Sequence, residues 1–245
     1  MLRRPGFIVF CCLGAFVLAG ASPRLLAQGM FEGVKSRIYA GLAFSYYNII
    51  GNSFDGTYGF SGPGDYLPVP KMEAAKGFGV VLGFRGENVG IELSYYYHRH
   101  NGTLEDPTPE FSGTRAEKVS DHNLNIDFKG RIWPGGRLEG YYQAGLAVVF
   151  ISVNKALFGI ENDEWKAMGD VTYQAVGLNI GLGLDFWLIR ELGLTAGVFY
   201  RPLFFTTLKE SPFGSSAEGG TFDVDVSGMK GHGLGVIIGI LVNLK

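Results

Sequence analysis

Cysteine is nearly absent from this sequence. The two cysteines, Cys11 and Cys12, are adjacent and lie inside an apolar run near the amino terminus. The chain after this run has none. A disulfide framework, a thiolate metal centre and a cysteine nucleophile are therefore excluded for that part of the chain.

Long hydrophobic runs and a marked excess of one charge are also missing. After residue 21 no run reaches the ~18 apolar residues of a membrane-spanning helix, and the longest candidate is 233–244. The chain has 21 basic and 23 acidic residues, a net charge of −2, with no basic stripe. We therefore expect neither a second membrane helix nor nucleic-acid binding.

The amino terminus has the three regions of a secretory signal peptide. Arg3 and Arg4 precede the apolar run 7–18, and small residues follow up to Ala21. This order predicts export, with cleavage after Ala21 or, as the alternative, after Ala27. An uncleaved anchor is disfavoured because the apolar run is shorter than a bilayer span. We expect a signal peptide at 1–21, a periplasmic amino-terminal segment at 22–36 and a single domain at 37–245.

Glycine and aromatic residues, by contrast, are abundant. The chain has 38 glycines and 14% aromatic residues, a composition that suits β-structure better than helices. Apolar residues recur at every second position, as in Leu178, Ile180 and Leu182, with Asn179 and Gly181 between them. A period of two is the pattern of a strand with one apolar face. Strands are predicted at 37–48, 77–85, 89–98, 123–133, 138–151, 171–188, 192–201 and 231–245.

The connections between these segments alternate strictly between short and long. Tight turns are expected at 86–88, 134–136 and 189–191. Long loops rich in glycine and polar residues are expected at 49–76, 99–118, 152–170 and 202–226. Short turns on one side and long loops on the other are typical of an outer-membrane barrel with its turns in the periplasm.

The tight turns also predict strand register, because paired strands must match like faces. The first turn pairs Phe84 with Ile91, and the third pairs Trp187 with Gly193. The second is expected to pair Arg131 with Glu139, an oppositely charged pair on the polar face. All three turns close without a conflict between the two faces.

The polar face decides which side of the barrel points inward. A soluble lipocalin-like barrel is the rival structure, but its outer face should be densely charged. Here that face has mainly glycine, threonine and asparagine on the last three strands. Glycine suits a crowded, narrow lumen, and the uncharged apolar face suits lipid. The predicted fold is an all-β, eight-stranded antiparallel transmembrane β-barrel with short periplasmic turns and long extracellular loops.

The charged residues of the polar face would then lie in the lumen. Buried charges persist when they are paired, so a structural salt-bridge network is the leading interpretation. A gated path for ions or small solutes is the alternative. The residues of this lumen charge network are Arg85, Glu92, Asp127, Lys129, Arg131, Glu139, Asp185 and Arg201.

Candidate chemistry outside this network is sparse. His98, His100 and His122 fall near the outer ends of two strands, and a symmetric hairpin would make His100 and His122 cross-strand neighbours. Solvated rim histidines are the simple interpretation, and divalent-metal binding is the alternative. No His-x-Ser pair of the lipid A deacylase kind occurs at any histidine. We therefore predict no catalytic residues, no enzymatic activity and no cofactor.

The segments 141–147 (YYQAGLA) and 181–188 (GLGLDFWL) carry a family resemblance. The pattern resembles the small eight-stranded outer-membrane barrels, namely the transmembrane domain of outer-membrane protein A and the outer-membrane protein X and Ail type. The resemblance implies a bacterial outer-membrane location, contact with outer-membrane lipid and insertion by the barrel-assembly machinery. The chain departs from such proteins in ending with Lys245, where they usually end in an aromatic residue.

Function is expected to reside in the long loops, because loops present variable contacts on a rigid scaffold. The leading hypothesis is a structural and surface-interaction protein, for example an adhesin that contacts a host or matrix protein. The alternative is a narrow conduit for small or hydrophobic solutes. Aromatic loop residues are the candidate contacts, although packing onto the barrel rim is the simpler interpretation for most of them. These residues are Phe54, Tyr58, Phe60, Tyr66, Phe158, Trp165 and Phe213.

Overall fold

The computed structural model describes most of the predicted barrel domain. The described residues are 37–50, 56–59, 66–69, 71–104, 115–134, 137–161, 164–210 and 223–244. The predicted signal peptide and periplasmic segment lie outside them. Among the described residues no helix is long and apolar enough to cross a membrane.

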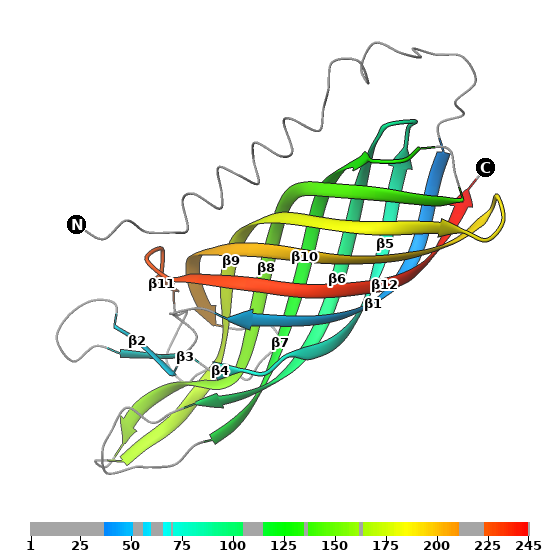
Figure 1. Cartoon of the computed structure of the whole chain (residues 1–245). Helices are drawn as coiled ribbons and strands as arrows, with labels where there is room; N and C mark the ends of the chain where they lie inside the picture. Colours follow the sequence, from blue (N-terminus) through cyan, green and yellow to red (C-terminus); the bar gives the residue numbers. More distant parts are fainter. Residues whose placement is uncertain are drawn as a thin grey trace, which may run out of the picture. The chain divides into compact units, whose positions relative to one another are not determined.

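Eight long strands form a closed antiparallel barrel (Figure 1). Each strand pairs with its neighbour in the chain, and β12 pairs with β1 to close the ring. This confirms the predicted fold class. The barrel strands are β1 (Arg37–Ile50), β5 (Ala75–Arg85), β6 (Val89–Leu104), β7 (Arg115–Arg131), β8 (Leu138–Glu161), β9 (Glu164–Trp187), β10 (Leu192–Glu210) and β12 (Lys230–Leu244).

Apolar side chains cover the outside of the barrel. Phe44 is 72% exposed and Leu182 57% exposed, whereas Asp185 and Trp187 on the alternate face of β9 are buried. Such a belt of exposed apolar side chains is unfavourable in water and favourable against lipid. The inside-out alternation predicted from the sequence is therefore the one observed.

Glycines of the inward face make room for large aromatic side chains. A Cβ added at Gly183 would collide with the ring of Tyr141, and one at Gly83 would collide with the ring of Tyr39. Both tyrosines are buried in the lumen. Tyrosines thus fill the narrow interior where glycines on neighbouring strands leave space.

Two of the three predicted turn registers are confirmed. Phe84 pairs with Ile91, and Trp187 pairs with Gly193. The register predicted at the second turn is wrong by two residues, because Arg131 pairs with Tyr141 rather than with Glu139. A shift of two keeps each side chain on its face, so the hydrophobic pattern alone did not distinguish the two registers.

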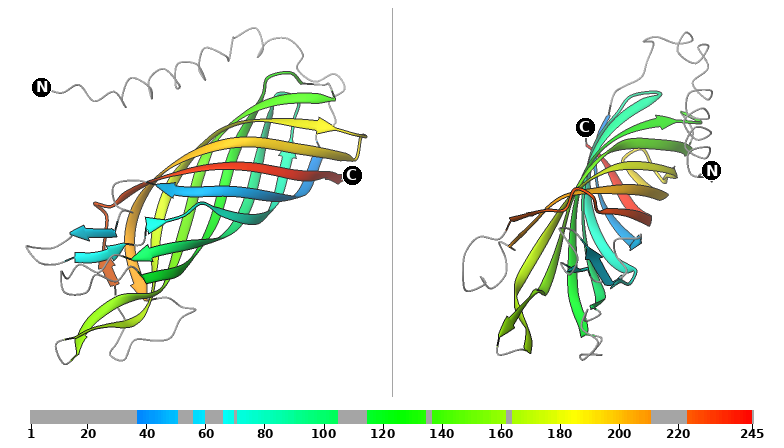
Figure 2. Two further views of the ribbon diagram at one scale, coloured as in Figure 1. Left: turned by 60° about the horizontal axis from the view of Figure 1, so that its bottom comes forward. Right: turned by 90° about the vertical axis from the view of Figure 1, so that its left-hand side faces the viewer.

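The strands run much further on the loop side than predicted. The expected loop 152–170 is wrong, because β8 and β9 continue as one hairpin and pair as far as Glu161 and Glu164. Figure 2 shows this hairpin projecting past the other strand ends. Four short strands accompany the loop ends: β2 (Gly56–Gly59), β3 (Tyr66–Val69), β4 (Lys71–Met72) and β11 (Asp223–Asp225).

The polarity of the two faces reverses where the strands pass beyond the belt. On β8, Phe150 faces outward within the belt, while Ser152 and Asn154 continue that outward face with polar side chains. Ile151 and Val153, which face inward, are fully buried. The outer part of the barrel therefore has an apolar core and a polar surface, like a soluble protein.

Candidate functional site in the barrel lumen

The end of the lumen next to the short turns holds a cluster around Glu139. Arg85 and Arg131 both donate hydrogen bonds to the carboxylate of Glu139. Arg131 also lies 4.0 Å from Asp185, and the guanidinium of Arg85 lies 4.8 Å from the ring centre of Trp187. The predicted Arg131–Glu139 contact is thus present, although the two residues are not directly paired across the strands.

The middle of the lumen is occupied by Lys129 and Glu92. Lys129 Nζ lies 2.6 Å from Glu92 Oε2, and Tyr39 donates a hydrogen bond of 2.7 Å to the same oxygen. Lys129 Nζ also lies 4.3 Å from the centre of the Tyr141 ring. The ammonium group is therefore held by one carboxylate and one aromatic face.

Arg201 crosses the lumen from β10. Its Nη1 donates a 2.7 Å hydrogen bond to Asn123 on β7, and Asn179 on β9 donates 2.9 Å hydrogen bonds to both carboxylate oxygens of Asp127. The guanidinium lies 4.9 Å from the ring centre of Phe199. Arg201 is only 1% exposed, and its hydrogen bond to Asn123 joins β10 to β7 across the lumen.

The network balances its charge within a buried environment. An unpaired buried charge costs several kcal/mol, so equal numbers of acids and bases in contact are the stable arrangement. Six of the eight residues are buried, and Arg85 and Arg131 are half-buried. The cations are Arg85, Lys129, Arg131 and Arg201, and the anions are Glu92, Asp127, Glu139 and Asp185.

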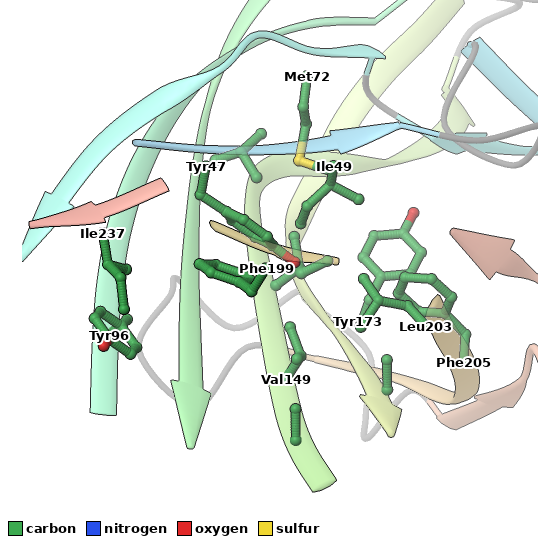
Figure 3. Packing of buried hydrophobic residues seen from close by; sticks show 14 of the residues in the cluster. Tyr47, Ile49, Met72, Tyr96, Val149, Tyr173, Phe199, Leu203, Phe205 and Ile237 are labelled. Atoms are coloured by element: carbon green, nitrogen blue, oxygen red, sulfur yellow. The ribbon is translucent and has the colours of Figure 1, made fainter. Parts of the chain in front are cut away.

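Apolar side chains fill the interior above this network. Figure 3 shows Met72, Ile49 and Tyr47 lying together near Phe199, with Tyr173 beside Leu203 and Phe205. The rings of Tyr173 and Phe205 meet edge to face at 6.3 Å. The lumen therefore has the charge network below, a buried layer of His98, His100 and Asp121 above it, and apolar side chains around that layer and beyond it.

The histidines divide between the two faces of the barrel. His98 and His100 are buried inside, whereas the register pairs His122 with Tyr97 on the outer face and His100 with Val119. The expected neighbourhood of His100 and His122 is therefore wrong, because the hairpin is asymmetric. His122 Nδ1 and the Tyr95 hydroxyl form a hydrogen bond of 2.8 Å. Within the described residues no group of three histidine, cysteine or acidic side chains could hold a metal ion.

Asp121 joins the two inward histidines, and sequence reasoning had not singled it out. Its carboxylate lies 2.7 Å from His98 Nδ1 and 3.6 Å from His100 Nε2. On the other side of His98, Nε2 lies 2.6 Å from the hydroxyl of Ser45. These residues come from three strands, so a search for short motifs along one strand does not find them.

His100 lies one level above the apolar belt, where the outward neighbours Arg99 and Asn101 are exposed. Burial lowers the pKa of His100, but the nearby carboxylate of Asp121 and the hydrogen bond to the carbonyl of Glu73 raise it by more. The net shift of the pKa is upward, which favours an imidazolium paired with Asp121.

The loop residues proposed as contacts are only partly described. Phe54, Phe60 and Phe213 lie outside the described residues. Tyr58 and Tyr66 belong to the paired strands β2 and β3. Phe158 and Trp165 belong to the projecting hairpin, where Phe158 pairs with Ala167 and Trp165 with Ile160.

No protein-family model matches the chain, and no curated protein matches it significantly in sequence. Solved structures do match. A major outer membrane protein from Thermus thermophilus has a TM-score of 0.56 at 11% identity over 85% of this chain and 99% of that one. The outer membrane protein OprG from Pseudomonas aeruginosa has a TM-score of 0.50 at 12% identity over 85% and 95%.

Ail, the attachment invasion locus protein of Yersinia pestis, matches more weakly, with a TM-score of 0.41 at 14% identity over 87% of this chain and all of that one. The fold is that of the small outer-membrane β-barrels. Together with the apolar belt, it locates the protein in the bacterial outer membrane.

Proposed function

We propose that this protein acts at the cell surface, through the hairpin and loops that its barrel carries beyond the membrane. The observation that supports this most is the filled interior. Buried ion pairs occupy the lumen within the belt, and an apolar core occupies it above. A lumen packed in these two ways is poorly suited to the passage of solutes, which favours contacts at the outer surface over conduction.

The length of the strands supports the same proposal. A tilted strand crosses a bilayer with about 9–11 residues, whereas β8 and β9 have 24 residues each. The additional residues extend the scaffold outward and carry Phe158 and Trp165, aromatic residues of the kind enriched at binding hot spots. A host or matrix protein is the partner that this arrangement suits.

Binding by intact cells tests the proposal. Cells that express the protein are applied to immobilised laminin, fibronectin and collagen, with cells carrying the empty vector as the reference. In the key variant Asn154 and Asp170 are joined through Asn-Gly, a sequence that forms two-residue hairpin turns. These two residues continue the register of the last regular pair, Val153 and Val171.

The truncated hairpin is expected to reduce adhesion at least tenfold while the barrel still folds. The matched control shortens the fourth loop by deleting residues 212–221. Heat-modifiable gel migration verifies folding of each variant. Equal adhesion by cells with and without the protein, or by cells with either truncation, would contradict the proposal.

A further inference from the structure

One rung of the barrel aligns a serine, a histidine and an aspartate. The register pairs Ser45 on β1 with Gly77 on β5, Gly77 with His98 on β6, and His98 with Asp121 on β7. A Cβ at Gly77 would collide with the imidazole of His98. Because Gly77 has no side chain, the His98 ring can lie across β5 and reach Ser45.

The hydrogen bonds have a defined direction. Asp121 Oδ1 lies 2.7 Å from His98 Nδ1, and an ionised carboxylate only accepts, so Nδ1 holds the proton. In the neutral ring, His98 Nε2 is then the acceptor for the Ser45 hydroxyl at 2.6 Å. Asn123 donates 2.9 Å to the other oxygen of Asp121 and fixes the carboxylate. This is the connectivity of serine-hydrolase triads, which recurs on unrelated folds.

Apart from His100, which lies 3.6 Å from Asp121, the outer side of the rung is lined by apolar side chains. Ile49, Met72 and Val119 are buried above it, and Ile151 continues the rung beside Asp121. Met72 belongs to β4, which is paired to β6 at only two positions. An acyl chain that approaches Ser45 from the outer side therefore has to displace these apolar side chains and the briefly paired β4.

We propose that Ser45, His98 and Asp121 form a serine-hydrolase site for esters with apolar acyl chains. Ser45 Oγ attacks the ester carbonyl carbon, and its proton passes to His98 Nε2. The bond to the alcohol oxygen breaks, and that oxygen takes the proton from Nε2. A water molecule then attacks the acyl-serine with His98 as base and releases the carboxylic acid. Asp121 is the positioning residue, because it holds the required tautomer of His98.

This activity is independent of the proposed surface binding, and it departs from the sequence-based expectation of no enzymatic activity. A search for His-x-Ser examines one strand, whereas here the register of four strands assembles the site. The apolar side chains above Ser45 point to a hydrocarbon chain as the part of the substrate that the site recognises.

The test uses the refolded full-length protein and an alkyl fluorophosphonate, which loses fluoride when it phosphonylates an activated serine. Wild type is expected to be labelled at Ser45, and Ser45→Ala to be unlabelled. Ser94→Ala is the matched control, because Ser94 is also a buried lumen serine but accepts a 3.0 Å hydrogen bond from Asn125. It should be labelled like wild type.

Two further measurements separate catalysis from structure. Asp121→Asn should lower the maximal labelling rate by roughly 10²–10⁴-fold without changing the probe affinity, with folding verified by heat-modifiable migration. Turnover of p-nitrophenyl esters should increase from acetate to octanoate. The proposal would be overturned if folded wild type is not labelled, or if Ser45→Ala is labelled at the wild-type rate. Equal turnover of the short and long esters would contradict the proposed substrate class.

Discussion

At the scale of single residues, the lumen is organised by complementarity of size and charge. Large tyrosines lie opposite glycines, and each acid of the charge network contacts a base or an amide. In a narrow barrel an added methyl group has no space to enter, and a lost partner leaves a buried charge. Substitutions here should therefore have effects that depend on the exact neighbour.

Gly183→Ala tests the size complementarity. Its Cβ would meet the Tyr141 ring and, at 2.6 Å, the carbonyl oxygen of Ala196. We expect it to destabilise the barrel by about 1–3 kcal/mol, as overpacking does. Gly140→Ala is the control, because its nearest contact is the exposed Trp133 side chain at 3.0 Å. Urea unfolding in detergent gives both values, and equal losses would contradict the packing explanation.

His100→Gln tests the charge complementarity through pH. His100 faces Asp121 on β7, His98 on its own strand and Tyr47 on β1. Because the folded pKa is raised, its stabilisation is complete below the unfolded pKa of about 6.5 and is lost as the pH rises through the folded pKa. The variant should therefore lose more stability at acidic than at alkaline pH. A loss that is larger at alkaline pH would show that the ion pair is not the cause.

At the scale of elements, the strands have two segments of opposite polarity. Within the belt the apolar residues face outward, and above it they face inward, as in the sequence of Phe150, Ile151, Ser152 and Val153 on β8. Residues alternate between apolar and polar in both segments, but the apolar residues change from outward to inward positions between them. Alternation within one segment does not reveal this change, because it does not show which face contacts lipid.

This reversal explains what could and could not be predicted from the sequence. The strand cores, their order and two turn registers followed from apolar alternation and turn length. The loop-side ends of the strands could not be predicted in this way, because polar outward residues such as Asn154 end the alternation of apolar outward residues. The Ser45–His98–Asp121 rung could not be predicted either, because it depends on pairing across β5 rather than on sequence spacing.

Arginine substitutions at outward positions test the two segments. Leu182 is exposed within the belt. Leu182→Arg should lower the free energy of unfolding by ~2–4 kcal/mol, because a charge then contacts lipid. Ser152→Arg on the outer segment should cost less than about 1 kcal/mol. Unfolding in lipid vesicles measures both. A similar cost at the two positions would mean that the membrane boundary lies elsewhere.

At the scale of the whole molecule, the barrel combines a membrane anchor with an outer scaffold. Paired charges fill the part within the belt, and an apolar core fills the part above. Two barriers of different chemistry lie in series, so weakening one should leave the other in place. This arrangement supports our proposal that the molecule carries contacts at the surface rather than conducting solutes.

Single-channel recording in planar lipid bilayers tests this account most directly. The refolded wild-type protein should show no resolved conductance steps, and Arg131→Ala should show none either, because the apolar core above the network is intact. Heat-modifiable migration establishes that the inserted protein is folded. Reproducible protein-dependent steps in wild type, changed in size by Arg131→Ala, would contradict the filled lumen and support a conducting path through the charge network.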